Sequence, residues 1–93
     1  MFKTNEYFDG QVKSIAFQAE SKAATVGVMA KGDYVFNTDD KEKMTVVSGS
    51  MYIKLSEADQ EVHYQAGESF DVAENSCFDV RIITETAYLC VYG

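Results

Sequence analysis

Residue types that usually perform catalysis are scarce in this sequence. Its single histidine, His63, is predicted to share a strand face with Glu61 and Gln65 and to be exposed to solvent. Cys77 and Cys90 lie in separate segments of alternating hydrophobicity, a placement typical of buried, reduced thiols rather than of a redox or zinc pair. Catalytic zinc or iron sites combine two or three histidine or cysteine ligands with a carboxylate. The sequence therefore predicts no bound metal.

Aromatic residues are more informative candidates. Tyr34 and Phe36 share a predicted strand face with Thr38, and Tyr88 shares one with Tyr92. Alternating aromatics first indicate core packing, because a sheet buries large rings readily. The same side chains inside a small barrel can instead hold a flat base by stacking, which contributes about 1–3 kcal/mol per base. The sequence leaves both interpretations open.

Net charge excludes two classes of partner. The chain has 93 residues, with 15 acidic and 8 basic side chains and a formal net charge of −7. Nucleic acids and anionic membranes are bound mainly through lysine and arginine, so we expect neither as a partner. A small anion is still compatible with this composition where a few donors gather locally. The sequence has neither a secretory signal nor an apolar run of about 18–20 residues, which predicts a cytoplasmic protein.

The candidate residues must be positioned by β-strands, because short segments alternate apolar and polar residues and none has helical spacing. Ser48-Gly49-Ser50 separates two such segments and is predicted to form a tight hairpin. We expect one all-β domain over residues 1–93, either a sandwich, a jelly roll or a small barrel. The nine predicted strands are Val12–Phe17, Ala24–Met29, Tyr34–Thr38, Met44–Val47, Met51–Leu55, Glu61–Gln65, Ser69–Val72, Cys77–Ile83 and Ala87–Tyr92.

Two segments resemble the motifs of the cupin fold, a jelly-roll barrel. The first, Gly32–Gly49, is a glycine-started strand that leads to Glu42 before a turn glycine, and the second is Gly67–Phe78. Cupins that bind metal place histidines at three positions, which here are Phe36, Thr38 and Phe78. Ala73 stands where the second motif normally has proline. The resemblance implies a single-domain cupin-type barrel of about nine short strands that has lost its metal ligands.

A finer resemblance covers nearly the whole chain. Four segments follow the order and spacing of the pyrimidine/purine nucleoside phosphorylase family, namely Asn5–Ile15, Val26–Met29, Met44–Gly49 and Tyr88–Cys90. The resemblance implies phosphorolysis of many nucleosides to the free base and ribose 1-phosphate by a homodimer. It implies no metal and no cofactor, with inorganic phosphate as co-substrate. Val91 departs from the pattern, because relatives are expected to carry a basic residue there.

The implied reaction suggests roles for individual residues. Tyr34, Phe36, Met44, Phe78 and Tyr88 are predicted to bind the substrate, with stacking of the base in an apolar slot. We expect the catalytic residues to be Thr38, which would hold the ribose, and Glu42, whose charge would stabilise the oxocarbenium ion. Glu42 also fits a second interpretation as a solvated turn residue. The candidates for phosphate binding are Arg81, Lys13, Lys43 and backbone N–H groups.

A different class of function fits the same residues. A cupin without metal can be a non-catalytic module that binds a small sugar or a nucleoside without turnover. The predicted partners are therefore nucleosides and phosphate, together with a second copy of the chain. A homodimer is expected because so small a domain buries only about 60–65% of its unfolded surface and must hide its strand edges. Phe2, Tyr7 and Phe8 are candidate interface aromatics.

Overall fold

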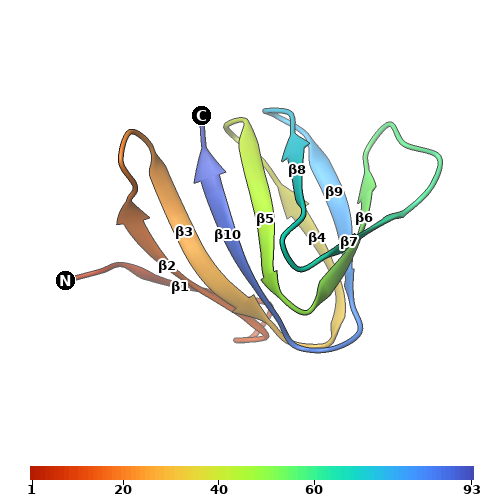
Figure 1. Cartoon of the computed structure of the whole chain (residues 1–93), viewed down its shortest axis with the longest axis horizontal. Coiled ribbons are helices and arrows are strands. Elements are labelled where there is room, and N and C mark those ends of the chain that lie inside the picture. The colour runs from red at the N-terminus through yellow and green to blue at the C-terminus, as the bar shows by residue number, and fades with distance from the viewer.

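The computed structural model describes all residues, 1–93, and folds them into ten β-strands (Figure 1). The strands are β1 (Thr4–Tyr7), β2 (Val12–Gln18), β3 (Ala23–Met29), β4 (Gly32–Asn37), β5 (Glu42–Ser48), β6 (Ser50–Leu55), β7 (Val62–Gln65), β8 (Ser69–Val72), β9 (Cys77–Ile82) and β10 (Thr86–Tyr92). The all-β prediction is confirmed. The chain contains no helix of the length and apolarity needed to cross a bilayer.

The ten strands form two antiparallel sheets. The large sheet has the order β1-β2-β3-β10-β5-β8 and the small sheet has the order β4-β9-β6-β7. Buried side chains from both sheets meet in one hydrophobic core, with Val12, Met29 and Val46 from the large sheet and Met51 and Ile53 from the small one. Figure 1 shows the two sheets facing each other, and their buried side chains form a single interior.

Aromatic contacts join the sheets along both of their sides. At one side, the ring of Tyr64 on β7 stacks on that of Phe70 on β8, with centroids 4.6 Å apart. At the other side, Phe8 in the turn after β1 packs on Tyr34 of β4 at 4.9 Å. Each contact removes apolar ring surface from water, which is the main favourable contribution to such a contact. These ring pairs close the two sheets into a barrel.

Strand β1 is absent from the nine predicted strands. Thr4–Tyr7 shows no apolar alternation, and its residues are exposed except for Asn5, which is half-buried. The segment is extended because it pairs antiparallel with β2, in a register that runs from Thr4 opposite Ile15 to Tyr7 opposite Val12. A strand that depends on its partner rather than on its own burial pattern leaves no period-two signal in the sequence.

The predicted hairpin at Ser48-Gly49-Ser50 is wrong. Strand β5 pairs with β10 and β8, whereas β6 pairs with β7 and β9, so the chain changes sheets at Gly49. Gly49 has a φ of +90°, and a Cβ there would lie 2.5 Å from Oγ1 of Thr86. Glycine is needed at this corner for its conformation and for its close approach to Thr86. Hairpin turns and corners between sheets use the same residue types, so the sequence did not separate them.

Alternation along β9 corrects the prediction for one cysteine. Phe78, Val80 and Ile82 face the core, while Cys77 and Arg81 face solvent. Cys77 is therefore exposed, contrary to the expected buried thiol, because the period of two places it on the same face as charged residues. Cys90 is buried, as predicted.

Candidate active site

The interior of the barrel contains a small cavity at the end where β10 finishes and β5 begins. We call it the inner cavity, and its volume is about 120 Å³. Predicted site residues among its lining are Phe36, Glu42, Met44, Phe78 and Tyr88. The cavity is also lined by residues that were not among the predicted site residues, namely Ser14, Met29, Asn37 and Cys90. Tyr92, which shares a strand face with Tyr88, and Tyr7, a predicted interface residue, complete the lining.

Two of the positions that hold histidine in metal-binding cupins form an aromatic wall of the inner cavity. Phe36 on β4 lies opposite Phe78 on β9, and their rings stack with centroids 5.8 Å apart and an angle of 27° between the planes. Phe78 is buried, and Phe36 is half-buried. The rings of Tyr7 and Phe8 pack on that of Phe36 in T-shaped geometry, with centroids 6.4 and 5.5 Å from that of Phe36. The wall is therefore an apolar surface with one ring partly accessible.

Glu42 is the one charged residue in the cavity lining. It begins β5, where it pairs with Tyr92 on β10, and it is half-buried rather than fully solvated. Cys90 donates a hydrogen bond from Sγ to Oε1 of Glu42 over 3.4 Å. Burial raises the pKa of the Glu42 carboxyl above its ordinary value, the hydrogen bond from Cys90 lowers it, and the charges of Asp40 and Asp39 raise it. The carboxyl is therefore half-buried, with one weak side-chain donor.

Hydroxyl groups line the cavity on the large sheet. Burial raises the pKa of Tyr88 to about 12, so its phenol remains protonated at neutral pH. The hydroxyl of Tyr92 lies 3.0 Å from Oγ1 of Thr25. Ser14 is buried and lies in the same row of the sheet as Tyr88, with Gly27 between them. The sequence did contain a signal for Ser14, because it is a serine at an inward position of the alternating segment that forms β2.

Gly27 provides the space for Tyr88. A Cβ at position 27 would lie 2.7 Å from the Tyr88 hydroxyl and 2.6 Å from the carbonyl oxygen of Lys13. Contacts that short do not occur, so any larger residue at position 27 would displace the phenol. The glycine in the middle of β3 therefore allows the Tyr88 ring to lie close against the sheet.

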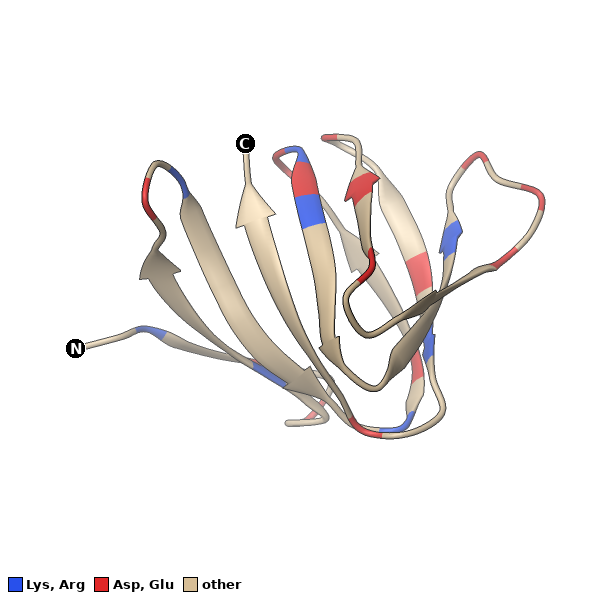
Figure 2. Cartoon of the chain, viewed as in Figure 1, with Lys and Arg blue, Asp and Glu red and all other residues tan.

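A second hollow borders the inner cavity at Glu42. It has a volume of about 230 Å³ and collects Lys22, Lys41 and Lys43 beside the carboxy-terminal Gly93, so we call it the lysine hollow. Figure 2 shows basic residues, coloured blue, at the neighbouring ends of β3 and β5, on either side of the carboxy terminus. Lys22 donates from Nζ to the Gly93 oxygen over 2.7 Å. Two further residues complete the lining, Asp71 and Val91.

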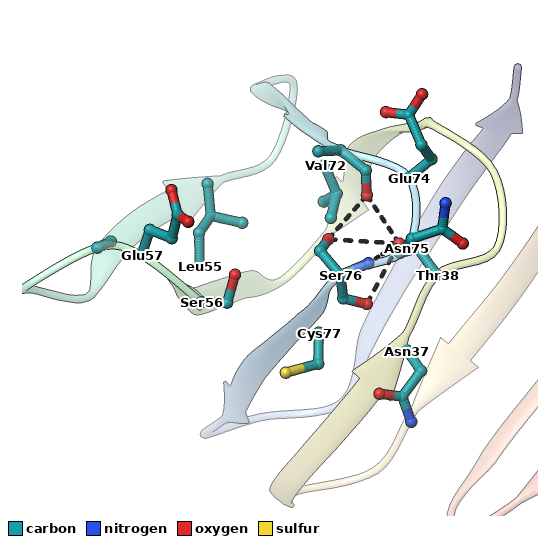
Figure 3. Close-up of a pocket in the computed structure, with 12 residues that line it drawn as sticks. Asn37, Thr38, Leu55, Ser56, Glu57, Val72, Glu74, Asn75, Ser76 and Cys77 are labelled. Carbon is teal, nitrogen blue, oxygen red and sulfur yellow. Dashed lines mark hydrogen bonds between the residues drawn. The ribbon is translucent and has the colours of Figure 1, made fainter.

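A larger, open groove borders the inner cavity at Asn37. This outer groove has a volume of about 890 Å³ and lies between the loop after β6 and the loop between β8 and β9 (Figure 3). Its charged residues are Glu57 and Glu74. The groove therefore offers room and a negative potential, which suits a neutral group better than an anion.

Thr38 lies in the wall of the outer groove and not in that of the inner cavity. Its buried hydroxyl donates to the carbonyl oxygen of Ala73 over 2.7 Å and accepts from the backbone N–H of Ser76 over 3.0 Å (Figure 3). Ser76 also donates its own hydroxyl to Ala73. The structure thus places Thr38 where it fixes the loop between β8 and β9.

Tyr34 and Arg81 are separate from the inner cavity. Tyr34 is buried in the core and donates to the carbonyl oxygen of Ala30 over 2.6 Å. Arg81 lies on the outer face of β9, where its guanidinium donates to both carboxylate oxygens of Glu61 at 2.8 and 3.2 Å. The guanidinium also lies over the ring of Tyr52, at 4.3 Å from its centroid.

Metal ligands do not gather at any point in the structure. No three side chains among histidine, cysteine, aspartate and glutamate lie close enough together to hold a metal ion. His63 is exposed, as predicted, and its ring stacks on Tyr52 with centroids 4.2 Å apart. The polar groups at the inner cavity are therefore hydroxyls, one amide, one thiol and one carboxylate.

Comparisons with solved structures show the cupin-type fold. A crystal structure of a Vibrio parahaemolyticus protein of unknown function matches with a TM-score of 0.96 and 43% identity, covering 100% of this chain and 99% of that one. An RmlC-like cupin from Shewanella frigidimarina matches with a TM-score of 0.76 at 18% identity, over 98% of this chain and 82% of its own. The predicted cupin-type barrel is confirmed, with ten strands rather than nine.

Comparisons of sequence identify the family. Residues 2–92 match the family model described as pyrimidine/purine nucleoside phosphorylase. Proteins of that name from Magnetococcus marinus and Hahella chejuensis are 55% and 50% identical, and each alignment covers 100% of both chains. Because the match extends over the strands that build the inner cavity, the chain belongs to the pyrimidine/purine nucleoside phosphorylase family.

Proposed function

We propose that the inner cavity is the active site at which this pyrimidine/purine nucleoside phosphorylase transfers a ribosyl group to inorganic phosphate. A phosphate oxygen forms a bond to C1′ and the bond from C1′ to the base nitrogen breaks. The base leaves with that electron pair, and the second product is ribose 1-phosphate. The proposal rests above all on Glu42, the one carboxylate in the wall of an otherwise uncharged, largely aromatic cavity.

Glu42 is proposed to act on the sugar. As the bond to the base lengthens, positive charge develops at C1′ and the ring oxygen. A fixed carboxylate stabilises that charge more strongly beside apolar walls than in water, because the surroundings screen it less. Ser14, Tyr88 and Tyr92 supply hydroxyls on the same side of the cavity, and these suit the ribose hydroxyls.

Phe36 and Phe78 are proposed to contact the base. Every base presents a flat π-face, so stacking on the accessible ring of Phe36 serves purines and pyrimidines alike. The inner cavity at about 120 Å³ is below the roughly 300–1,000 Å³ of typical ligand pockets, so it holds only part of a nucleoside. We propose that the ribose lies beside Glu42 in the inner cavity, while the base lies on the ring of Phe36 and extends past Asn37 toward the outer groove. Thr38 then acts through the loop that it fixes, without touching the sugar.

The lysine hollow is proposed to attract inorganic phosphate. Among the predicted cations, Arg81 is paired with Glu61, and Lys13 lies 3.6 Å from Glu6. Lys43 has no carboxylate within 4.0 Å and shares its hollow with Lys22 and Lys41, next to Glu42. Glu42, Asp71 and the carboxy-terminal Gly93 also line the hollow, so it offers three ammonium donors to phosphate rather than a net positive charge.

A homodimer through the outer face of the large sheet completes the proposal. Ile15, Val26 and Leu89 lie side by side across β2, β3 and β10, and Val28 extends this apolar area. Ile15, Val26 and Val28 are exposed, which a stable partner would change. Phe8 is also exposed, but its ring packs on Tyr34 and Phe36 of its own chain. We expect Val26→Lys to dissociate the dimer in analytical ultracentrifugation. Sedimentation of the unaltered protein as a 10.4 kDa species alone at micromolar concentration would contradict the proposal.

Turnover assays test the proposed function. Purified protein is incubated with uridine or adenosine, with and without inorganic phosphate, and with EDTA as a control for bound metal. We expect release of uracil and adenine only with phosphate, and no effect of EDTA. Binding without release of base would support the non-catalytic module instead, and equal release in the absence of phosphate would show hydrolysis.

A further inference from the structure

The reaction as proposed so far gives no role to Cys90, although this residue contacts Glu42. The thiol is buried, with 2% of the residue exposed, and it lines the inner cavity. Its Sγ donates to Oε1 of Glu42 over 3.4 Å. The Glu42 carboxylate has no other side-chain hydrogen bond and no ion pair in the structure. The orientation of the carboxylate therefore depends on this thiol.

The register of the large sheet explains the contact. On β10 and β5, Tyr92 pairs with Glu42 and Cys90 pairs with Met44. Cys90 is thus the diagonal neighbour of Glu42 on the inner face, within reach of a long side chain. Cysteine has one side-chain torsion angle, so the strand backbone largely determines where its sulfur lies. Glutamate has three such angles, and it gains a preferred orientation by bonding to a fixed donor.

We propose that Cys90 is a positioning residue for phosphorolysis, with a thiol that holds the Glu42 carboxylate against the wall of the inner cavity so that it faces the sugar. The inference rests on the proposed function of Glu42. In this role Cys90 donates one hydrogen bond to Glu42 and takes no other part in the reaction. Burial raises the pKa of the Cys90 thiol well above its usual range, so the sulfur keeps its proton and remains a donor at any working pH.

The thiol also affects the charge state of Glu42. Its hydrogen bond favours the carboxylate and opposes the effect of burial on the Glu42 pKa. Removal of the donor should therefore raise that pKa and protonate Glu42 at a higher pH. Titratable and charged groups surround Glu42 on several elements. They are Cys90, Tyr88 and Tyr92 on β10, Tyr7 on β1, Asp39, Asp40 and Lys41 in the preceding loop, Lys43 on β5, Asp71 on β8, Lys22 before β3 and the carboxy-terminal Gly93. None of these is altered in the variants below except Cys90.

The test compares Cys90→Ala with Cys90→Ser, and the matched control is Ser69→Ala on β8, which removes one side-chain hydrogen bond to Thr45 outside the inner cavity and the outer groove. Uridine phosphorolysis is measured as a function of pH. We expect Cys90→Ala to lower kcat about tenfold, the size of one lost hydrogen bond to a charged group, and to move the acidic limb of the profile to higher pH. Cys90→Ser retains a donor and should keep most of the activity. Ser69→Ala should match the unaltered protein.

A second measurement separates this inference from the proposed function. The pKa of the Glu42 carboxyl is measured by carbon-13 NMR titration in the unaltered protein and in Cys90→Ala, which needs no turnover. We expect a higher pKa in the variant, with Cys90→Ser closer to the unaltered protein. An unchanged pKa would overturn the inference. So would a loss of kcat and melting temperature in Cys90→Ser as large as that in Cys90→Ala, because that result indicates packing alone. Absence of phosphorolysis in the unaltered protein would instead contradict the proposed function.

Discussion

Glu42 and Glu61 are two carboxylates of one small barrel, and they differ in burial and in hydrogen-bond partners. Glu61 lies on the outer face of the small sheet, where Arg81 donates to both of its oxygens and lowers its pKa. Glu42 lies in the wall of the inner cavity, where burial raises its pKa and a thiol is its one donor. The positive charge of a paired guanidinium largely cancels the electric field of a carboxylate, so the carboxylate acts only weakly on a ligand. A neutral donor such as the thiol does not cancel that field, so the Glu42 carboxylate can act on a ligand in the cavity.

The two regions differ in solvent as well as in pairing. Water and dissolved salt screen the charges of Arg81 and Glu61, so that region has little influence on a charge more than about 10 Å away. The apolar rings of Phe36 and Phe78 exclude water from one side of the inner cavity. A single charge there acts over a short distance with a low effective dielectric constant. The comparison indicates that catalysis should depend on Glu42 and be indifferent to Glu61.

The largest expected effect comes from removing the two charges one at a time. Glu42→Gln should lower kcat by about 10²–10³, the size seen when one preorganised electrostatic group is lost. Glu61→Gln should leave kcat unchanged, because the residue lies outside the cavity. Steady-state kinetics with uridine and adenosine measure both. A normal kcat in Glu42→Gln would show that Glu42 has no catalytic role and is a solvated turn residue.

The aromatic wall gives the next effect. Phe36→Ala should weaken transition-state binding by about 1–3 kcal/mol for purine and pyrimidine nucleosides alike, since stacking does not depend on the edges of the base. The control is Tyr52→Ala, which removes a ring beside Arg81. A thermal melt accompanies the kinetics, because Phe36 also packs against Phe8 and Phe78. Loss of stability with normal kinetics in the folded fraction would show that Phe36 is a core residue only.

A smaller effect is expected in the lysine hollow. Lys43→Gln should raise the KM for phosphate about three- to tenfold, the consequence of losing one partly screened charge, and leave the KM for the nucleoside nearly unchanged. Lys13→Gln is the matched control, because Lys13 pairs with Glu6 away from the hollow. Phosphate-saturation curves at fixed uridine distinguish the two. Equal KM values in both variants would place the phosphate elsewhere.

The smallest effect concerns stability and has opposite signs at the two carboxylates. The pKa of Glu42 is raised on folding, so its ionisation opposes folding as the pH rises above about 4, and Glu42→Gln should melt at a slightly higher temperature at neutral pH. The pKa of Glu61 is lowered, so it stabilises the fold above its unfolded pKa and loses that contribution on acidification. Glu61→Gln should therefore melt slightly lower at neutral pH. Melts at neutral and acidic pH test the sign, and a fall in both variants would contradict the assigned environments.

Local periodicity predicted most of the fold and the aromatic part of the site. The alternation that gave β9 also determines that Phe78 faces the interior and Arg81 the solvent. Applied strictly, it would have excluded Cys77 from the core and Arg81 from the cavity. The resemblance to cupin motifs drew attention to Phe36 and Phe78, and the structure brings them into contact.

Long-range pairing determined the features that the sequence did not predict. β1 is extended because it pairs with β2, and the chain changes sheets at Gly49 because β5 and β6 have different neighbours. Thr38 follows Phe36 at strand spacing, yet its hydroxyl is committed to a loop that arrives 35 residues later. Cys90 reaches Glu42 across 48 residues of sequence. No local pattern contains such contacts, which only the assembled large sheet creates.

The most direct test of the account is to locate bound product on the unaltered protein. Backbone amide chemical shifts are recorded by NMR as ribose 1-phosphate is added. We expect the largest shift changes at the inner cavity, in the amides of Phe36, Glu42 and Tyr88, and no change in the amide shifts of Glu61 and Arg81. Changes centred on Glu61 and Arg81, with none at Glu42, would contradict the claim that the inner cavity is the active site.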